Sequence, residues 1–289
     1  PGKQPRKIAA GPWHIGAFDW SPDSLGIAFE HRPTPDADNM RRSDISEDTM
    51  ENGAITALAP TGASESQPVY SPDSRYIAFV RSANPPTRLT PNRVVLHARG
   101  SGSVRELAAT PDESPTLLDW SPDSRRIYFN EARGTRGAVY SLPVDGPPVV
   151  AYRPSRGTLG LGTRISGNVA GFSRQSSEEP AEAFILKLDG GEPVQVSRAN
   201  AHIEKPPLGE TRVVTWKSKD GAEVEGLLTL PVNYKAGQRV PSSLQIYGGP
   251  ARAGLASIPS RHWRRRASQY CALTLAVHRA TAAIFGELI

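Results

Sequence analysis

The sequence contains a single cysteine, Cys271, among its 289 residues. An internal disulfide is therefore excluded, and cysteine usage says little about the cellular compartment. Long apolar runs are missing as well, because the longest one late in the chain, Cys271 to Val277, is far shorter than the ~20 residues that cross a bilayer. Residues 1–18 lack the apolar core of a secretory signal, and the chain begins with Pro1 rather than methionine. We therefore expect a processed product or a fragment, without a membrane span.

A strong excess of charge of one sign is also absent. The chain has 34 Lys and Arg against 29 Asp and Glu, a net charge of +5, and its basic residues are scattered along most of its length. Nucleic acid is therefore not an expected partner. The six histidines show no metal-ligand spacing with cysteine or carboxylates, and no glycine-rich phosphate loop follows a strand pattern, so we expect neither a metal nor a cofactor. These histidines are His14, His31, His97, His202, His262 and His278.

What the sequence does contain is a phrase that recurs every 50 residues. It reads aromatic–Ser–Pro–Asp–Ser–x–x–Ile–Ala/Tyr–Phe and begins at Trp20, Tyr70 and Trp120. Pro and Asp suit the central positions of a turn, and the Ile and Phe that follow lie on one face of a strand. A turn-plus-strand unit with a period of ~40–50 residues predicts the blades of a β-propeller. The content of 26 Gly and 27 Pro, together 53 residues of 289, fits a chain with many turns.

A fourth unit follows in a more degenerate form. The strand pattern Ala183–Leu188 precedes Asp189-Gly190, as in the hairpins of the earlier units, and its turn phrase is reduced to Ile165–Phe172. The pattern stops at Lys205-Pro206-Pro207. Residues 1–205 are therefore predicted to form about four blades.

A different kind of segment follows this boundary. The strand patterns Val213–Trp216 and Val224–Leu230 flank Asp220-Gly221, a pair that suits a tight hairpin turn. A third strand pattern, Ser243–Tyr247, leads into Gly248-Gly249-Pro250. Such a segment has no place in a chain made of propeller blades alone.

Together these patterns resemble the prolyl oligopeptidase family of serine peptidases, especially its bacterial dipeptidyl-aminopeptidase and acylaminoacyl-peptidase branch. In that family a propeller of SPD-type blades precedes an α/β-hydrolase domain, whose opening is similar to residues 215–250 here. The turn phrase alone is shared with TolB-like propellers, so residues 215–250 make the resemblance specific. It implies a mainly β chain, with a partial propeller over residues 1–205 and the beginning of an α/β-hydrolase domain over residues 211–289.

The resemblance also implies two candidate sites. In α/β-hydrolases, backbone N–H groups of the loop after this strand stabilise the oxyanion, and dipeptidyl peptidases add a tyrosine hydroxyl at the position of Tyr247. Tyr247, Gly248 and Gly249 are therefore the oxyanion-hole candidate, with a plain turn at a strand end as the alternative. Dipeptidyl peptidases also bind the free amine of the substrate through paired glutamates in the propeller. Glu178 and Glu179 are a weaker candidate for that role, and an ordinary acidic loop is the interpretation we favour.

The catalytic triad does not follow. No G-x-S-x-G motif occurs in the chain, and the late histidines, His262 and His278, follow no such elbow. We therefore expect a fragment of a serine peptidase that hydrolyses short peptides in the dipeptidyl- or acylaminoacyl-peptidase manner, with the propeller gating access, and inactive by itself. A TolB-like interaction module and a pseudoenzyme are the alternatives.

Other properties stay open at this point. The last 39 residues are either diverged or read in a shifted frame. Peptide specificity, exo- or endopeptidase action and oligomeric state are not indicated by the sequence. A cytoplasmic location is favoured over a periplasmic or secreted one.

Overall fold

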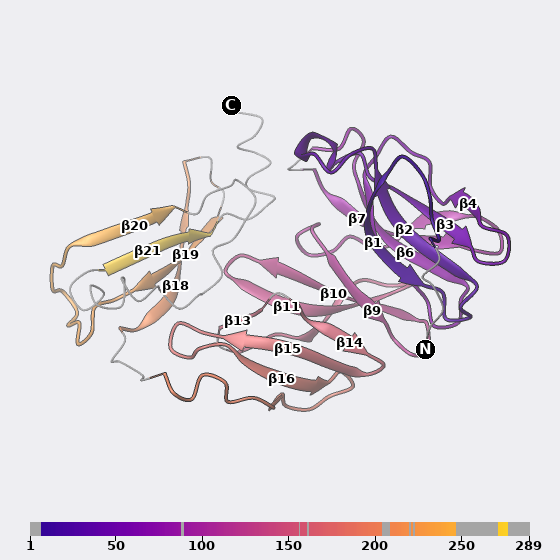
Figure 1. The fold of residues 1–289 in the computed structure, drawn as a ribbon. Coiled ribbons are helices and arrows are strands. Elements are labelled where there is room, and N and C mark those ends of the chain that lie inside the picture. Colours follow the sequence, from indigo (N-terminus) through magenta and orange to yellow (C-terminus); the bar gives the residue numbers. More distant parts are fainter. Residues whose placement is uncertain are drawn as a thin grey trace. The chain divides into compact units, whose positions relative to one another are not determined.

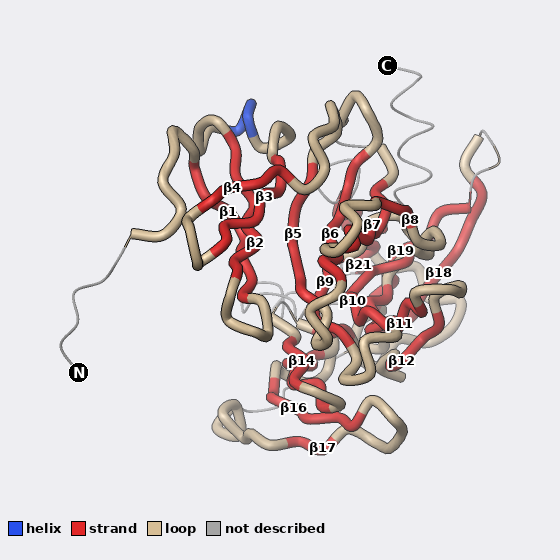
Figure 2. Tube along the Cα trace, turned by 90° about the vertical axis from the view of Figure 1, so that its right-hand side faces the viewer, coloured by secondary structure: helices blue, strands red, loops and turns tan. Residues whose placement is uncertain are grey.

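The computed structural model describes residues 7–87, 90–155, 157–160, 162–203, 209–219, 221, 223–246 and 271–276 (Figure 1). These residues are nearly all in strands, turns and loops, and the one helix among them is the short 3-10 helix Ala37–Asn39 (Figure 2). The chain forms two compact units. The first contains Pro1–Phe129 and Ser141–Val149, and the second contains Asn130–Tyr140 and Val150–Ile289.

The first two blades are four-stranded antiparallel sheets in which consecutive strands are neighbours, the arrangement of a propeller blade. Blade 1 consists of β1 (His14–Trp20), β2 (Gly26–Arg32), β3 (Asp44–Thr49) and β4 (Ala54–Ala57). Blade 2 consists of β5 (Glu65–Tyr70), β6 (Tyr76–Ser82), β7 (Asn92–Ala98) and β8 (Val104–Glu106).

The next two sheets follow the same plan. Blade 3 consists of β9 (Thr116–Trp120), β10 (Arg126–Arg133), β11 (Arg136–Pro143) and β12 (Val149–Tyr152). Blade 4 consists of β13 (Thr158–Leu159), β15 (Val169–Gln175), β16 (Glu182–Lys187) and β17 (Val194–Gln195), with β14 (Arg164–Ser166) also paired to β15. None of these sheets closes on itself within the described residues. The predicted mainly β fold with about four blades is confirmed.

Each Ser-Pro-Asp-Ser turn is held by the same hydrogen bonds. In blade 2 the Ser71 hydroxyl donates to Asp73 Oδ1 at 2.6 Å and accepts from the Tyr76 N–H at 2.9 Å. The corresponding distances are 2.5 and 2.8 Å in blade 1, and 2.5 and 3.0 Å in blade 3. The last serine of the turn adopts φ of about +60°, as Ser74 shows (60°), which is uncommon for a residue with a side chain. The turn therefore depends on the serine and aspartate side chains that the sequence repeats.

Neighbouring blades contact one another through equivalent positions, about one repeat apart. The Tyr70 N–H donates to Asp19 Oδ2 at 2.7 Å, and the Trp120 indole N–H donates to the Val69 carbonyl at 3.1 Å. Both bonds join residues 51 positions apart. The period in the sequence is thus the period of contacts between blades.

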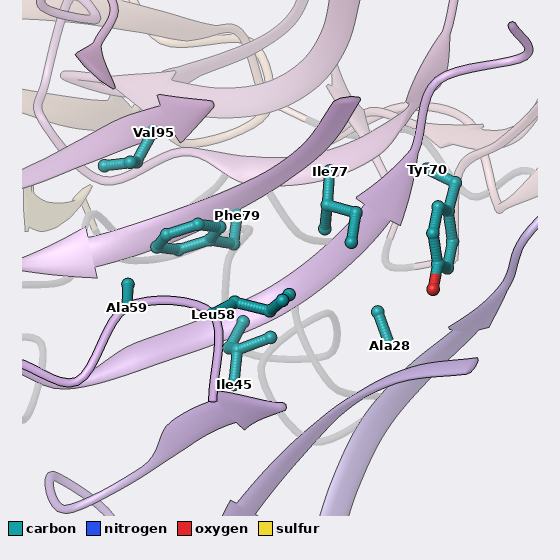
Figure 3. Packing of buried hydrophobic residues seen from close by; sticks show 8 residues of the cluster. All are labelled: Ala28, Ile45, Leu58, Ala59, Tyr70, Ile77, Phe79 and Val95. Atoms are coloured by element: carbon teal, nitrogen blue, oxygen red, sulfur yellow. The ribbon is translucent and has the colours of Figure 1, made fainter. Parts of the chain in front are cut away.

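One cluster of buried apolar residues in the first unit lies where blades 1 and 2 meet (Figure 3). Its members come from β2, β3, β5, β6 and β7 and from the loop between the blades. They are Ala28, Ile45, Leu58, Ala59, Tyr70, Ile77, Phe79 and Val95.

The innermost strand of blade 1 is not covered in this way. Trp20 is 48% exposed and Phe18 is 61% exposed, whereas the repeat equivalents of Trp20 are buried, Tyr70 at 3% and Trp120 at 1%. Tyr70 and Trp120 each pack on the preceding blade. The face of β1 therefore has no equivalent neighbour within the described residues.

The last sheet differs from the blades. It contains β18 (Thr211–Lys217), β19 (Glu223–Thr229), β20 (Ser242–Ile246) and β21 (Cys271–Ala276), in the order β18-β19-β21-β20. β20 and β21 pair in parallel. The assignment of residues 211–289 to the beginning of an α/β-hydrolase domain stays a prediction. The apolar run near Cys271, which the sequence alone left unassigned, supplies β21. The predicted boundary at residues 205–207 lies outside the described residues.

Candidate functional site

The predicted oxyanion loop follows strand β20. This strand pairs in parallel with β21 from Ser242 to Ile246. Tyr247, Gly248 and Gly249 come next and lie outside the described residues. In open α/β sheets, ligand sites form at the carboxyl ends of strands, which is where β20 brings this loop. Its role as an oxyanion hole stays a prediction.

The opening hairpin, which we define as β18 and β19, supports β20 through β21. Its two strands pair without a bulge from Thr211–Thr229 to Lys217–Glu223. At its turn the Gly221 N–H donates to the Ser218 carbonyl at 3.0 Å, and φ of Gly221 is +85°, which glycine adopts without strain. β19 then pairs with β21, so the hairpin and the loop-bearing strand belong to one sheet.

Glu178 and Glu179 lie in the loop between β15 and β16. Both side chains are exposed. Their backbone N–H groups donate to the Ser176 hydroxyl at 3.1 and 3.0 Å, and the Ser176 N–H donates to the Glu179 carbonyl at 3.0 Å. The residues therefore form a compact turn with two carboxylates on its surface. Amine binding by this pair stays a prediction.

A further acidic group was missed by the sequence reasoning. Asp19 and Asp119 immediately precede two of the three repeat aromatics, and Glu30 lies on β2, the strand that pairs with β1. Burial raises the pKa of each of these carboxyls above its usual value, and the charge of Asp19 adds to the raised pKa of Asp119. For Asp19 and Asp119 the available signal was an aspartate directly before the tryptophan of the repeat phrase. Within the described residues no three His, Cys, Asp or Glu side chains gather as metal ligands.

Glu65 is the most strongly perturbed carboxyl of the first unit. Its side chain is fully buried at the start of β5, and burial raises its pKa to about 7. The Thr61 hydroxyl donates to Oε1 at 2.6 Å and lowers the pKa, whereas the charge of Asp44 raises it and that of Arg81 lowers it. Such a group exchanges a proton near neutral pH.

A second polar group joins blades 1 and 2. The Tyr70 hydroxyl donates to Glu47 Oε1 at 2.8 Å, and Arg99 Nε donates to the same oxygen at 3.0 Å. The Arg99 guanidinium also lies over the Tyr70 ring, 5.2 Å from its centre. Burial, followed by the charge of Glu47, raises the pKa of Tyr70. These three side chains link blades 1 and 2, and the raised pKa keeps the Tyr70 hydroxyl protonated.

Among the described residues, no helix has the length and apolar character that crossing a membrane requires.

No family model matches the sequence. Among curated proteins, the chain is 27% identical over 274 residues to the probable dipeptidyl-peptidase 5 of Trichophyton verrucosum, a match covering 86% of this chain and 37% of that protein. Among solved structures, it is similar to a puromycin hydrolase mutant, with a TM-score of 0.69, 15% identity, and coverage of 96% of this chain and 44% of the other. The acylaminoacyl peptidase of Pyrococcus horikoshii gives a TM-score of 0.64 at 16% identity, covering 90% of this chain and 39% of the other.

The chain spans about a third of the length of the curated relatives it matches. The relative from Trichophyton is fungal, so the bacterial branch stays a prediction. The solved structures share the fold at low identity, and the part they share includes the propeller of a peptidase. Sequence relatives and structural neighbours together support the assignment of this chain to the prolyl oligopeptidase family of peptidases, of whose members it covers one part.

Proposed function

We propose that this chain is the propeller part and the opening of the hydrolase domain of a serine peptidase that acts on short peptides. The observation that carries the proposal is the sheet β18-β19-β21-β20 after four blades, three of which have Ser-Pro-Asp-Ser turns, since Tyr247 directly follows β20 in the sequence. Its curated relatives are named dipeptidyl-peptidase 5, which favours removal of dipeptides over other peptide chemistry.

In the proposed mechanism this chain stabilises the negative charge of the oxyanion. The Tyr247 hydroxyl and the backbone after it would donate hydrogen bonds to the oxyanion that forms when a serine attacks the peptide carbonyl. The sequence contains no G-x-S-x-G elbow to supply the attacking serine. It therefore has no elbow after which the orienting aspartate and the histidine base could follow in chain order. The blades would limit access to short peptides.

The proposal predicts that this polypeptide does not hydrolyse peptides by itself. Incubation with a fluorophosphonate probe should leave the chain unlabelled, and dipeptidyl and acylaminoacyl amide substrates should release no product. An active serine hydrolase labelled in the same tube is the control. Stoichiometric labelling of a serine in this chain would overturn the prediction of inactivity.

The origin of the chain is tested by the nucleotide sequence on either side of its coding region. We expect a downstream G-x-S-x-G, followed by an aspartate and then a histidine, in one of the reading frames. Flanking sequence without such a motif in any frame would instead favour an interaction module built on the same scaffold.

A further inference from the structure

The turn between β10 and β11 differs from its counterparts in the other blades. It contains two residues, Gly134 and Thr135, whereas the equivalent connections are residues 33–43, 83–91 and 176–181. Most described residues of those longer loops are exposed or partly exposed, but Gly134 and Thr135 are both buried. A hairpin tip is normally open to water. In this one, the carboxylate of Glu225 on β19 lies against the turn.

The turn provides two donors to one carboxylate oxygen. The Thr135 N–H donates to Glu225 Oε2 at 2.9 Å, and the Thr135 hydroxyl donates to the same oxygen at 3.2 Å. Thr135 is 2% exposed and Glu225 is half-buried, so the donor side of these bonds is shielded from water. Hydrogen bonds to an ionised acceptor are roughly twice as strong as bonds between neutral groups.

Gly134 completes this arrangement because it has no side chain. A Cβ at this position would lie 2.1 Å from Glu225 Oε2, so any larger residue would displace the carboxylate. The glycine also adopts φ of +61°, the left-handed conformation that a two-residue hairpin turn requires. Backbone conformation and close approach therefore both call for glycine here.

Glu225 occupies the central strand of its sheet. It pairs with Thr215 on β18 and with Ala276 on β21. The strand places Val224 and Gly226 on one face and Glu225 on the other. A contact at this position therefore restrains both strands of the opening hairpin, because β19 is paired along its length with β18.

We infer that the Gly134–Thr135 turn is a binding socket for the Glu225 carboxylate, and that this contact makes the β10–β11 hairpin of blade 3 and the opening hairpin move as one body. The inference goes beyond the proposed function, because it requires no catalytic activity.

Hydrogen exchange of the Thr135 amide in the intact chain tests the inference directly, since this N–H is one of the two donors. In Glu225→Ala we expect its exchange to become about tenfold faster, together with faster exchange across residues 223–229. Glu225→Gln keeps an oxygen acceptor without the charge and should give a smaller rise. The matched control is Glu223→Gln, an exposed glutamate on the same strand, which should leave the Thr135 amide unchanged.

A second variant changes the turn and leaves the carboxylate intact. Gly134→Ala should accelerate exchange in residues 223–229 although Glu225 is intact. If this substitution unfolds the β10–β11 hairpin, as circular dichroism would show, Thr135→Val removes the hydroxyl donor and leaves the backbone in place. Unchanged Thr135 exchange in Glu225→Ala, or equal acceleration in Glu223→Gln, would overturn the inference.

Discussion

Glu65 shows what burial does to a single side chain in this fold. The carboxyl is enclosed at the start of β5, has one hydroxyl donor in Thr61 and lies near the charge of Asp44. Its pKa of about 7 lies well above the usual value for glutamate. The folded chain therefore holds this proton at pH values where the unfolded chain has already released it.

The sign of the pH dependence follows from that difference. A carboxyl with a raised folded pKa contributes stability below the unfolded pKa of about 4.3, and this contribution is lost as the pH rises through about 7. We expect the free energy of unfolding to fall by about 1–3 kcal/mol between pH 5 and pH 8. Urea titrations at several pH values measure this change in the free energy of unfolding. Glu65→Gln should reduce this slope, while Glu51→Gln, an exposed residue of the same unit, should retain it. The slope that remains belongs to the other buried carboxyls, Asp19, Glu30 and Asp119. A slope in Glu65→Gln equal to that of the original chain would show that Glu65 does not contribute to it.

At the scale of an element, the repeated turn is the unit that the sequence specifies most completely. The serine hydroxyl links the aspartate to the first N–H of the following strand, and the last serine is held at a positive φ. Removing the hydroxyl leaves that N–H buried without its acceptor.

Ser71→Ala should therefore destabilise the chain by about 2 kcal/mol. Chemical denaturation followed by circular dichroism measures the change in unfolding free energy. Ser121→Ala, at the equivalent position of blade 3, should have a similar effect. Ser155→Ala, an exposed serine outside the strands, should change stability by less than about 0.5 kcal/mol. Equal stability of Ser71→Ala and the original chain would mean that the turn does not depend on the hydroxyl.

On the scale of the whole molecule, the blades form a linear series. Contacts between blades join residues one repeat apart, and the described chain forms two compact units. In such an array the stability is distributed over nearest neighbours.

Unfolding in urea should therefore occur in more than one step. We expect the transition seen by circular dichroism, which reports all strands, to differ from the transition seen by tryptophan fluorescence. Trp120→Phe should shift the fluorescence transition, because it removes the indole bond to Val69 between blades 2 and 3. Coincident transitions with both probes would instead indicate one cooperative unit.

The sequence predicted those parts of the fold that depend on local chemistry. Pro, Asp and Ser at fixed spacing specify the turn, and the Ile and Phe after it specify the buried face of a strand. The socket at Gly134 and the raised pKa of Glu65 were not predictable from local sequence. The first depends on Glu225 and the second on burial and on the charges of Asp44 and Arg81, which lie far away along the chain. The candidate site was predicted by its motif, but Tyr247 lies outside the described residues, so the strand leading to it is the part that the structure confirms.

The unequal environments of the repeat aromatics give the chain an optical reporter of its own. Trp120 is enclosed between blades 2 and 3, while the indole of Trp20, half exposed on β1, is open to water. Their emission spectra should therefore differ, with Trp20 emitting at longer wavelength and accessible to a soluble quencher. Any protein surface that covers β1 would shift the emission of Trp20 toward that of Trp120 and protect it from the quencher. Occupation of this face can thus be followed without a label.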